Sequence, residues 1–97
     1  MINELLLTML RADLEQPSPT VNEYLLELID AAKESIEATG IWLTDTARDR
    51  NLVVMYAAYL YRKRKADNPK GEDKMPRMLR SAINDRLMKE KGKVAES

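Results

Sequence analysis

The chain has 97 residues with 44% apolar and 33% charged side chains, a formal net charge of zero, and neither cysteine nor histidine. This length suits a single domain, and the missing residue types exclude thiol nucleophiles, disulfides, the usual zinc sites and the common general base near neutral pH. No apolar segment reaches the roughly 20 residues of a membrane-spanning helix, so we expect a soluble protein of the cytoplasm.

The first part of the chain predicts a short helix, a loop and a long amphipathic helix. Apolar residues follow helical spacing over residues 2–10, and two prolines interrupt this spacing within residues 13–19. Thr20 and Glu23 have the spacing of a capping box, so we expect the second helix to begin there. Gly40 stands where a left-handed residue would end that helix. One face of the helix is apolar, and its polar face carries Glu23, Glu27, Asp30, Lys33, Glu34 and Glu37.

A third helix is expected to run to about residue 66. Its possible N-caps are Thr44, Asp45 and Thr46. Thr46 and Asp49 come close to a capping box, although Asp is shorter than the usual Glu. Over residues 52–61 the sequence is apolar around the whole helix, which indicates contacts on several sides. We therefore predict an all-α fold, a compact bundle of about four helices with the apolar third helix at its centre. Trp42, the only tryptophan, precedes this helix, and we favour a core position for it over an interface position.

The last part of the chain predicts a loop and a fourth helix. Residues 67–74 are polar, and Pro76 suits the first turn of a helix. The apolar stripe of this helix contains Leu79, Ala82, Ile83 and Leu87. Residues 92–97 have no apolar period, so we expect a frayed tail after a single helical domain over residues 1–91.

Charge is divided unequally along the chain. Residues 1–43 contain two basic and eight acidic side chains, a net charge of −6, and the remaining residues carry the balancing +6. Opposite charges on two parts of a molecule favour head-to-tail association of copies, with Glu27 and Glu34 as the candidate subunit interface. Two solvated surfaces on a monomer are the alternative, because charge asymmetry alone is a weak signal.

A run of basic residues follows three tyrosines at the end of the third helix. Basic side chains beside aromatic rings can bind phosphates and stack on bases, so Arg62, Arg64 and Lys65 are candidate DNA-contacting charges. We favour the alternative in which the tyrosines pack in the core and the basic residues form a solvated helix end. No other cluster suits chemistry, because the carboxylates form a solvated helix face and the glycines are isolated. We therefore expect no enzyme activity and no catalytic, metal-binding or cofactor-binding residues.

Four segments carry a resemblance to a known family: Leu10-Arg11-Ala12-Asp13, the helix from Leu28 to Glu37 that ends in Thr39-Gly40, Ala58-Tyr59-Leu60-Tyr61 before the basic run, and the helix from Met75-Pro76 to Asn84. In this order they resemble the small head–tail connector proteins of tailed bacteriophages and prophages, also known as head-completion or DNA-packaging adaptors. One departure is the sequence EQPSP at residues 15–19, where the family commonly has an acidic run.

The resemblance implies a non-enzymatic structural protein of the virion. Such proteins assemble as rings, typically dodecamers, below the portal and extend the channel through which DNA passes. The implied partners are copies of the chain, the portal protein, the next head-completion or tail protein and non-specifically bound DNA, with assembly in the host cytoplasm. Two alternatives stay open: a small helical nucleic-acid-binding protein that acts through its basic C-terminal half, and a regulatory module that binds a host protein.

Overall fold

The computed structural model describes residues 2–15, 19–65 and 75–96, with side chains for residues 2–15, 20–64 and 75–91. These residues form a short 3-10 helix, η1 (Pro19–Val21), and four α-helices: α1 (Asn3–Leu14), α2 (Asn22–Ala38), α3 (Ala47–Lys65) and α4 (Arg77–Glu96). The described ranges contain no strand. The predicted all-α fold is confirmed.

Helix α1 is longer than the apolar pattern predicted, because it ends at Leu14 rather than near Leu10. Leu6 and Leu10 are fully buried, and Leu14 packs against the same core, so the additional turn removes further apolar surface from water. Glu15 then adopts a left-handed backbone conformation with φ of 54°, which ends the helix.

Helix α2 begins at Asn22, after η1, and not at the predicted capping box. Thr20 lies within η1, and Val21 occupies the cap position without a side-chain hydrogen bond to the helix. Thr20 therefore precedes the observed cap position by one residue, so Thr20 and Glu23 do not occupy the N-cap and N3 positions that the capping box requires. The predicted helix is confirmed, and its predicted N-cap is wrong.

The two faces and the end of α2 agree with the sequence pattern. The apolar face is buried, and all the carboxylates of the polar face are exposed. Gly40 has a φ of 107°, and its amide donates a hydrogen bond to the carbonyl oxygen of Glu37 at 3.0 Å. A side chain at this φ would strain the backbone, so the chain needs glycine here. The buried residues are Leu25, Leu28, Ile29, Ala32 and Ile36.

Helix α3 is the central element, since it packs against α1, α2 and α4. Of the three possible caps of this helix, Thr46 forms the capping bond, because its hydroxyl oxygen accepts a hydrogen bond from the Asp49 amide at 3.2 Å. Tyr56 and Leu60 are partly buried against the core, so apolar residues on several sides of the helix make contacts. The buried apolar members of this helix are Leu52, Val53, Val54, Ala57, Ala58 and Tyr61.

Helix α4 follows Pro76, whose carbonyl oxygen accepts a hydrogen bond from the Arg80 amide at 3.0 Å. Leu79 and Ile83 are buried, and the other two residues of the predicted apolar stripe are partly buried, so this stripe is confirmed. The backbone stays helical as far as Glu96, beyond the point where we expected a frayed tail. The loop predicted at residues 67–74 lies outside the described residues.

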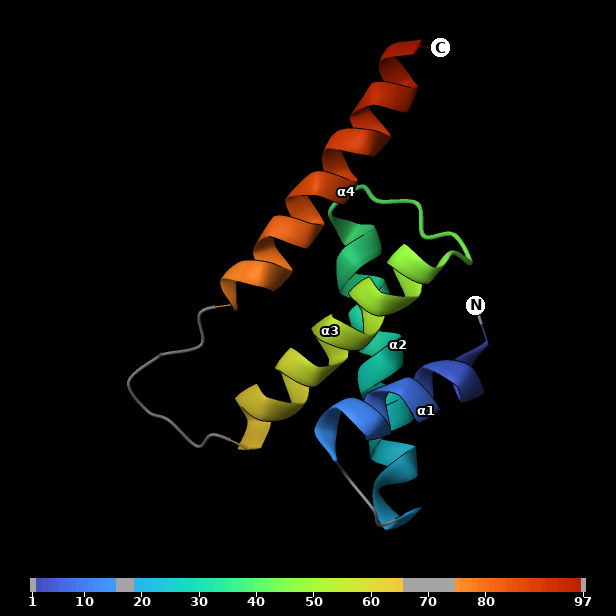
Figure 1. Cartoon of the computed structure of the whole chain (residues 1–97), viewed down its shortest axis with the longest axis vertical. Coiled ribbons are helices and arrows are strands. Elements are labelled where there is room, and N and C mark those ends of the chain that lie inside the picture. Colours follow the sequence, from blue (N-terminus) through green and yellow to red (C-terminus); the bar gives the residue numbers. More distant parts are fainter. Residues whose placement is uncertain (1, 16–18, 66–74, 97) are drawn as a thin grey trace.

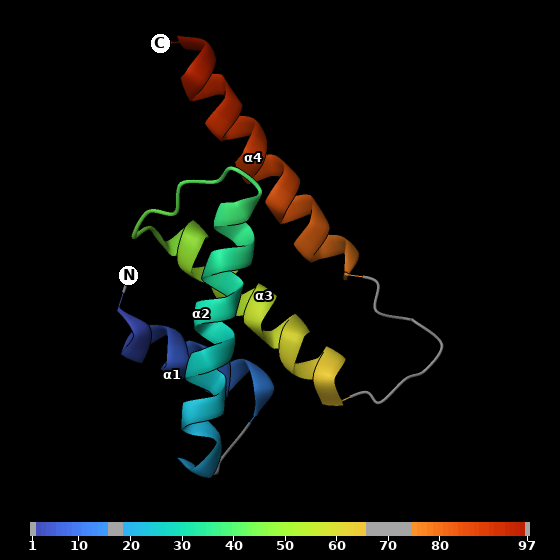
Figure 2. The ribbon, with the colours of Figure 1, turned by 180° about the vertical axis from the view of Figure 1, so that it is seen from behind.

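The helices form two layers over a flat molecule with extents of 46, 34 and 18 Å. Figure 1 shows α1 and α3 in front of α2, and the view from behind in Figure 2 shows α2 in front of both. Helix α4 packs along α3, and its C-terminal part projects past the other helices. The core therefore lies between α2 and the layer of α1 and α3, and α4 closes one edge.

Candidate functional site

The structure places four of the five sequence-predicted candidate residues on the surface. Arg62 and Arg64 of α3 and Glu27 and Glu34 of α2 are all exposed. Among the described residues, no group of three or more carboxylates is arranged to hold a metal ion. None of the described helices combines the length and the apolar character needed to span a membrane.

The basic end of α3 contacts α1 and α2. Arg62 Nη2 lies 3.4 Å from Asp13 Oδ2, in an ion pair whose side chains are 63% and 49% exposed. The Arg64 guanidinium carbon lies 5.7 Å from the centre of the Tyr24 ring, within the range of a cation–π interaction. The side chain of Lys65 lies outside the described residues. The structure thus brings two of the three candidate charges to one end of the helix, where water screens their contacts.

The tyrosines near this end pack against the core, as we favoured. Tyr61 is buried, and its ring centre lies 6.2 Å from that of Tyr24. Tyr56 and Tyr59 are partly buried and meet edge to face with ring centres 5.9 Å apart. Lys63 Nζ lies 5.9 Å from the centre of the Tyr59 ring. A base that stacked on these rings would have to displace neighbouring side chains.

The outer face of α2 carries a row of carboxylates, which we call the acidic stripe. In the described structure, none of them forms an ion pair, and the only hydrogen bond to them runs from Asn3 Nδ2 to Asp30 Oδ1 at 3.4 Å. Both candidate interface residues belong to this stripe, so they are available to a partner. Its five exposed members follow three- and four-residue steps: Glu23, Glu27, Asp30, Glu34 and Glu37.

A buried ion pair that we did not predict joins α4 to the start of α3. Arg86 Nε donates a hydrogen bond to Asp49 Oδ1 at 2.8 Å, and Arg86 Nη2 donates to Asp49 Oδ2 at 3.2 Å. The two side chains are 6% and 1% exposed. Nη2 also donates to the Trp42 carbonyl oxygen, and Nη1 donates to Glu90 Oε1, both at 2.6 Å. One guanidinium therefore connects α4 both to the α2–α3 link and to α3.

The surroundings of Asp49 favour its charged form. Burial, the largest single influence, raises the pKa of this carboxyl, but hydrogen bonds from Arg86 and from the Thr44 amide and hydroxyl together hold the pKa below its usual value. The hydrogen bond to Asp49 is the main cause of the raised pKa of Arg86. The sequence contained a signal that Arg86 is buried, because Arg86 follows Leu79 and Ile83 at the spacing of the apolar stripe of this helix.

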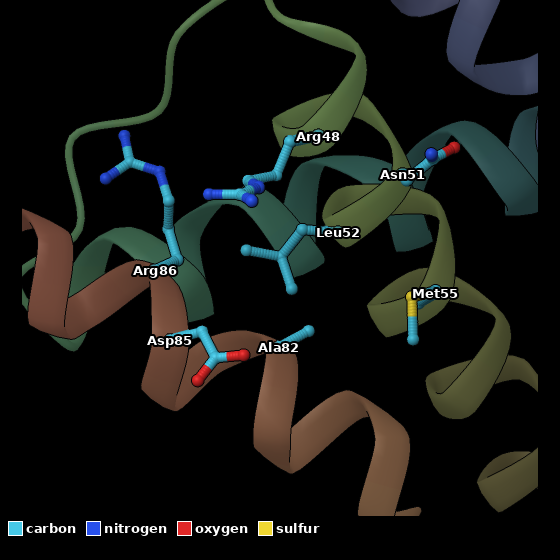
Figure 3. Close-up of a pocket in the computed structure, with 7 residues that line it drawn as sticks. All are labelled: Arg48, Asn51, Leu52, Met55, Ala82, Asp85 and Arg86. Atoms are coloured by element: carbon cyan, nitrogen blue, oxygen red, sulfur yellow. The ribbon is translucent and has the colours of Figure 1, made fainter.

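An open groove of about 360 Å³ separates α3 from α4 beside this ion pair. Figure 3 shows Arg48 extending from α3 toward α4. The lining is mixed, with an apolar part from both helices and a polar part in which Arg86 is already paired with Asp49. This combination selects no ligand class. The lining residues are Arg48, Asn51, Leu52, Met55, Ala82, Asp85 and Arg86.

Trp42 does not lie in the core, and the position that we favoured from the sequence is wrong. Its side chain is 77% exposed, whereas its neighbour Ile41 is buried. A non-helical link that passes over the core turns only some of its side chains inward, and Ile41 takes the buried place. Met78 and Met88 of α4 are also exposed. Tryptophan is strongly enriched among residues that dominate binding energies, so Trp42 is a candidate contact for a partner.

Comparisons of the chain with protein-family models, with curated proteins and with solved structures found no match. The resemblance in sequence and the charges and side chains of the described surface are therefore the features that point to a function.

Proposed function

We propose that the chain is a structural head–tail connector of a tailed phage or prophage, which assembles as a ring below the portal and extends the DNA channel during head completion. The observation that carries this proposal is the separation of charge between surfaces. The acidic stripe covers the outer face of α2, while exposed basic side chains gather on α3 and α4. The resemblance of the four sequence segments to connector proteins supports the same function.

Self-assembly follows from this separation of charge. An acidic surface and a basic surface at different places on one chain are suited to heterologous contacts, in which each copy uses both surfaces. Such contacts close into a ring when a whole number of the rotations that relate neighbouring copies completes one full turn. Each exposed ion pair contributes only about 0.2–1 kcal/mol, so the assembly depends on several pairs in every interface and on many interfaces.

The basic end of α3 suits the lining of a DNA channel. Arg62, Arg64 and Lys65 recur once per subunit in a ring, and their summed field holds a polyanion without reading its sequence. The exposed Trp42 offers an apolar contact for the portal protein or for the next head-completion or tail protein. The proposed place of the protein is the head–tail junction of the virion, reached by assembly in the host cytoplasm.

Sedimentation velocity over a range of protein concentrations, followed by electron microscopy of the assembled fraction, tests the proposal. We expect closed rings of the wild-type chain at high concentration or on purified portal. Replacing Glu27 and Glu34 with Lys should prevent the rings and leave the helical circular dichroism spectrum unchanged, because both positions are exposed. A wild-type chain that stays monomeric at every concentration and does not bind portal would contradict the proposal.

The second candidate is a small nucleic-acid-binding protein, which the basic residues beside Tyr24 and Tyr59 favour. Such a protein binds DNA as a monomer, with an affinity that falls steeply as salt concentration rises. A connector has little affinity for DNA until it is assembled. Electrophoretic mobility shifts with monomeric protein at low and high salt concentration distinguish the two functions.

A further inference from the structure

The outer face of α4 carries a second row of exposed side chains, which we call the basic stripe. Its members follow three- and four-residue steps, as those of the acidic stripe do. The stripe contains no carboxylate, and in the described structure its three cations form no ion pair. Nothing that the structure describes neutralises this charge. The members of the stripe are Arg77, Arg80, Asn84, Met88 and Lys91.

The two stripes have the same length. The acidic stripe runs from residue 23 to residue 37 and the basic stripe from residue 77 to residue 91, so each spans about 21 Å at 1.5 Å per residue. Both have five members with an average spacing of 3.5 residues. Rows with this spacing stay in contact when two helices pack side by side at a small crossing angle.

The stripes cannot serve as each other's partner within one chain. Helix α3 packs against both α2 and α4, and the members of both stripes are exposed. Figures 1 and 2 show α2 in one layer and α3 in the other, with α4 alongside α3. The acidic stripe of one copy is therefore free to meet the basic stripe of another.

We infer that the acidic stripe of α2 docks along the basic stripe of α4 of a second copy of this chain, as an antiparallel pair of helices. This inference rests on the proposed self-assembly and adds the receiving surface. Antiparallel pairing sets opposite helix dipoles beside each other. It also brings Arg80 opposite Glu34 and places Asn84 opposite Asp30 at the middle of the contact. The remaining pairs are Arg77 with Glu37, Lys91 with Glu23 and Met88 with Glu27.

A polyanion such as DNA is the competing occupant of the basic stripe. The matching length and spacing of the two stripes favour a helix of a second copy as the occupant. A flexible or continuous polyanion requires neither this length nor this spacing. The exposed Met88 within the stripe also favours a protein surface, since a flexible methionine side chain packs against protein side chains and makes no bond to phosphate.

Charge-reversed variants of the full chain test the inference by sedimentation velocity at low salt concentration. The first variant carries Glu23→Lys and Glu34→Lys, and the second carries Arg80→Glu and Lys91→Glu. We expect the sedimentation coefficient of wild type to rise with concentration, and we expect each variant alone to lose this rise. An equimolar mixture should regain it, because the reversed stripe of each variant then faces a complementary stripe. Circular dichroism verifies that the exposed substitutions leave the fold intact.

The matched control carries Arg48→Glu and Lys89→Glu, which change the net charge as much as the second variant does but lie off both stripes. We expect it to assemble as wild type does. The inference is overturned if the Arg80→Glu and Lys91→Glu variant still assembles, or if the mixture stays monomeric while wild type assembles. It is also overturned if that variant loses only DNA binding, which would identify a polyanion as the occupant. A wild-type chain that never assembles overturns the proposed function as well.

Discussion

Arg86 and Asp49 are 37 residues apart in sequence and form a buried, two-bond ion pair between α4 and the start of α3. The apolar contribution of α4 to the core is small, because Leu79 and Ile83 are the only buried apolar residues among its described side chains. The guanidinium therefore determines which part of α4 meets the α2–α3 link, where it also binds the Trp42 carbonyl oxygen. A buried pair of this kind is costly to break, since removal of one partner leaves an uncompensated charge.

Replacing Arg86 with Met should lower the free energy of unfolding by about 3–5 kcal/mol, because Asp49 is then buried without its cation. The double variant Asp49→Leu with Arg86→Met should recover most of this loss. Arg50→Met serves as the control, because Arg50 pairs with the exposed Asp45. This substitution should lower the free energy of unfolding by less than about 1 kcal/mol. Urea unfolding measures all four proteins, and equal losses for Arg86→Met and Arg50→Met would contradict the assigned role.

Stability should fall in acid because the pKa of Asp49 is lower in the folded chain than its unfolded value of about 3.9. Between the two pKa values the unfolded chain binds more protons, so the free energy of unfolding falls as pH falls. The contribution of Asp49 is fully present above about pH 5 and disappears as pH falls through the folded pKa.

Thermal melts of wild type and Asp49→Asn between pH 7 and pH 3 measure this effect. The difference between the two melting temperatures should be largest at neutral pH and should shrink as pH approaches 3. A difference that stays constant over this range would show that the charge of Asp49 is not what stabilises the fold.

Trp42→Ala should change the free energy of unfolding by less than about 0.5 kcal/mol, because the indole is exposed. The adjacent substitution Ile41→Ala should cost about 2–5 kcal/mol, because Ile41 is buried. Chemical denaturation compares the two variants. A loss at Trp42 as large as that at Ile41 would show that the indole packs against the core.

Replacing Arg62, Arg64 and Lys65 with Gln should leave the helical spectrum and any ring intact while DNA retention in assembled particles falls. Gln keeps helix propensity and removes only charge. The exposed pair of Arg62 with Asp13 contributes little to stability. Arg48→Gln with Lys89→Gln is a control at other exposed basic sites. Particles of the triple variant that package and retain DNA as wild type does would show that these residues are a solvated helix end.

The sequence by itself determined that this protein is helical and which faces of α2 and α4 are buried. The polar and apolar faces of α2, the apolar circumference of α3 and the glycine that ends α2 follow from residue spacing and from backbone geometry within a few neighbours. The positions of Glu27, Glu34, Arg62 and Arg64 at the surface follow from the same periodicity.

Only the tertiary structure decided how these elements meet. Whether Ile41 or Trp42 is buried depends on the path of the link over the core, which no periodic pattern encodes. The cap of α2 depends on the 3-10 turn before it. The partner of Asp49 depends on where α4 packs, because Arg86 lies far away along the chain. Helical spacing acts over three or four residues, whereas these contacts join distant segments, so the packing of the whole chain selects them.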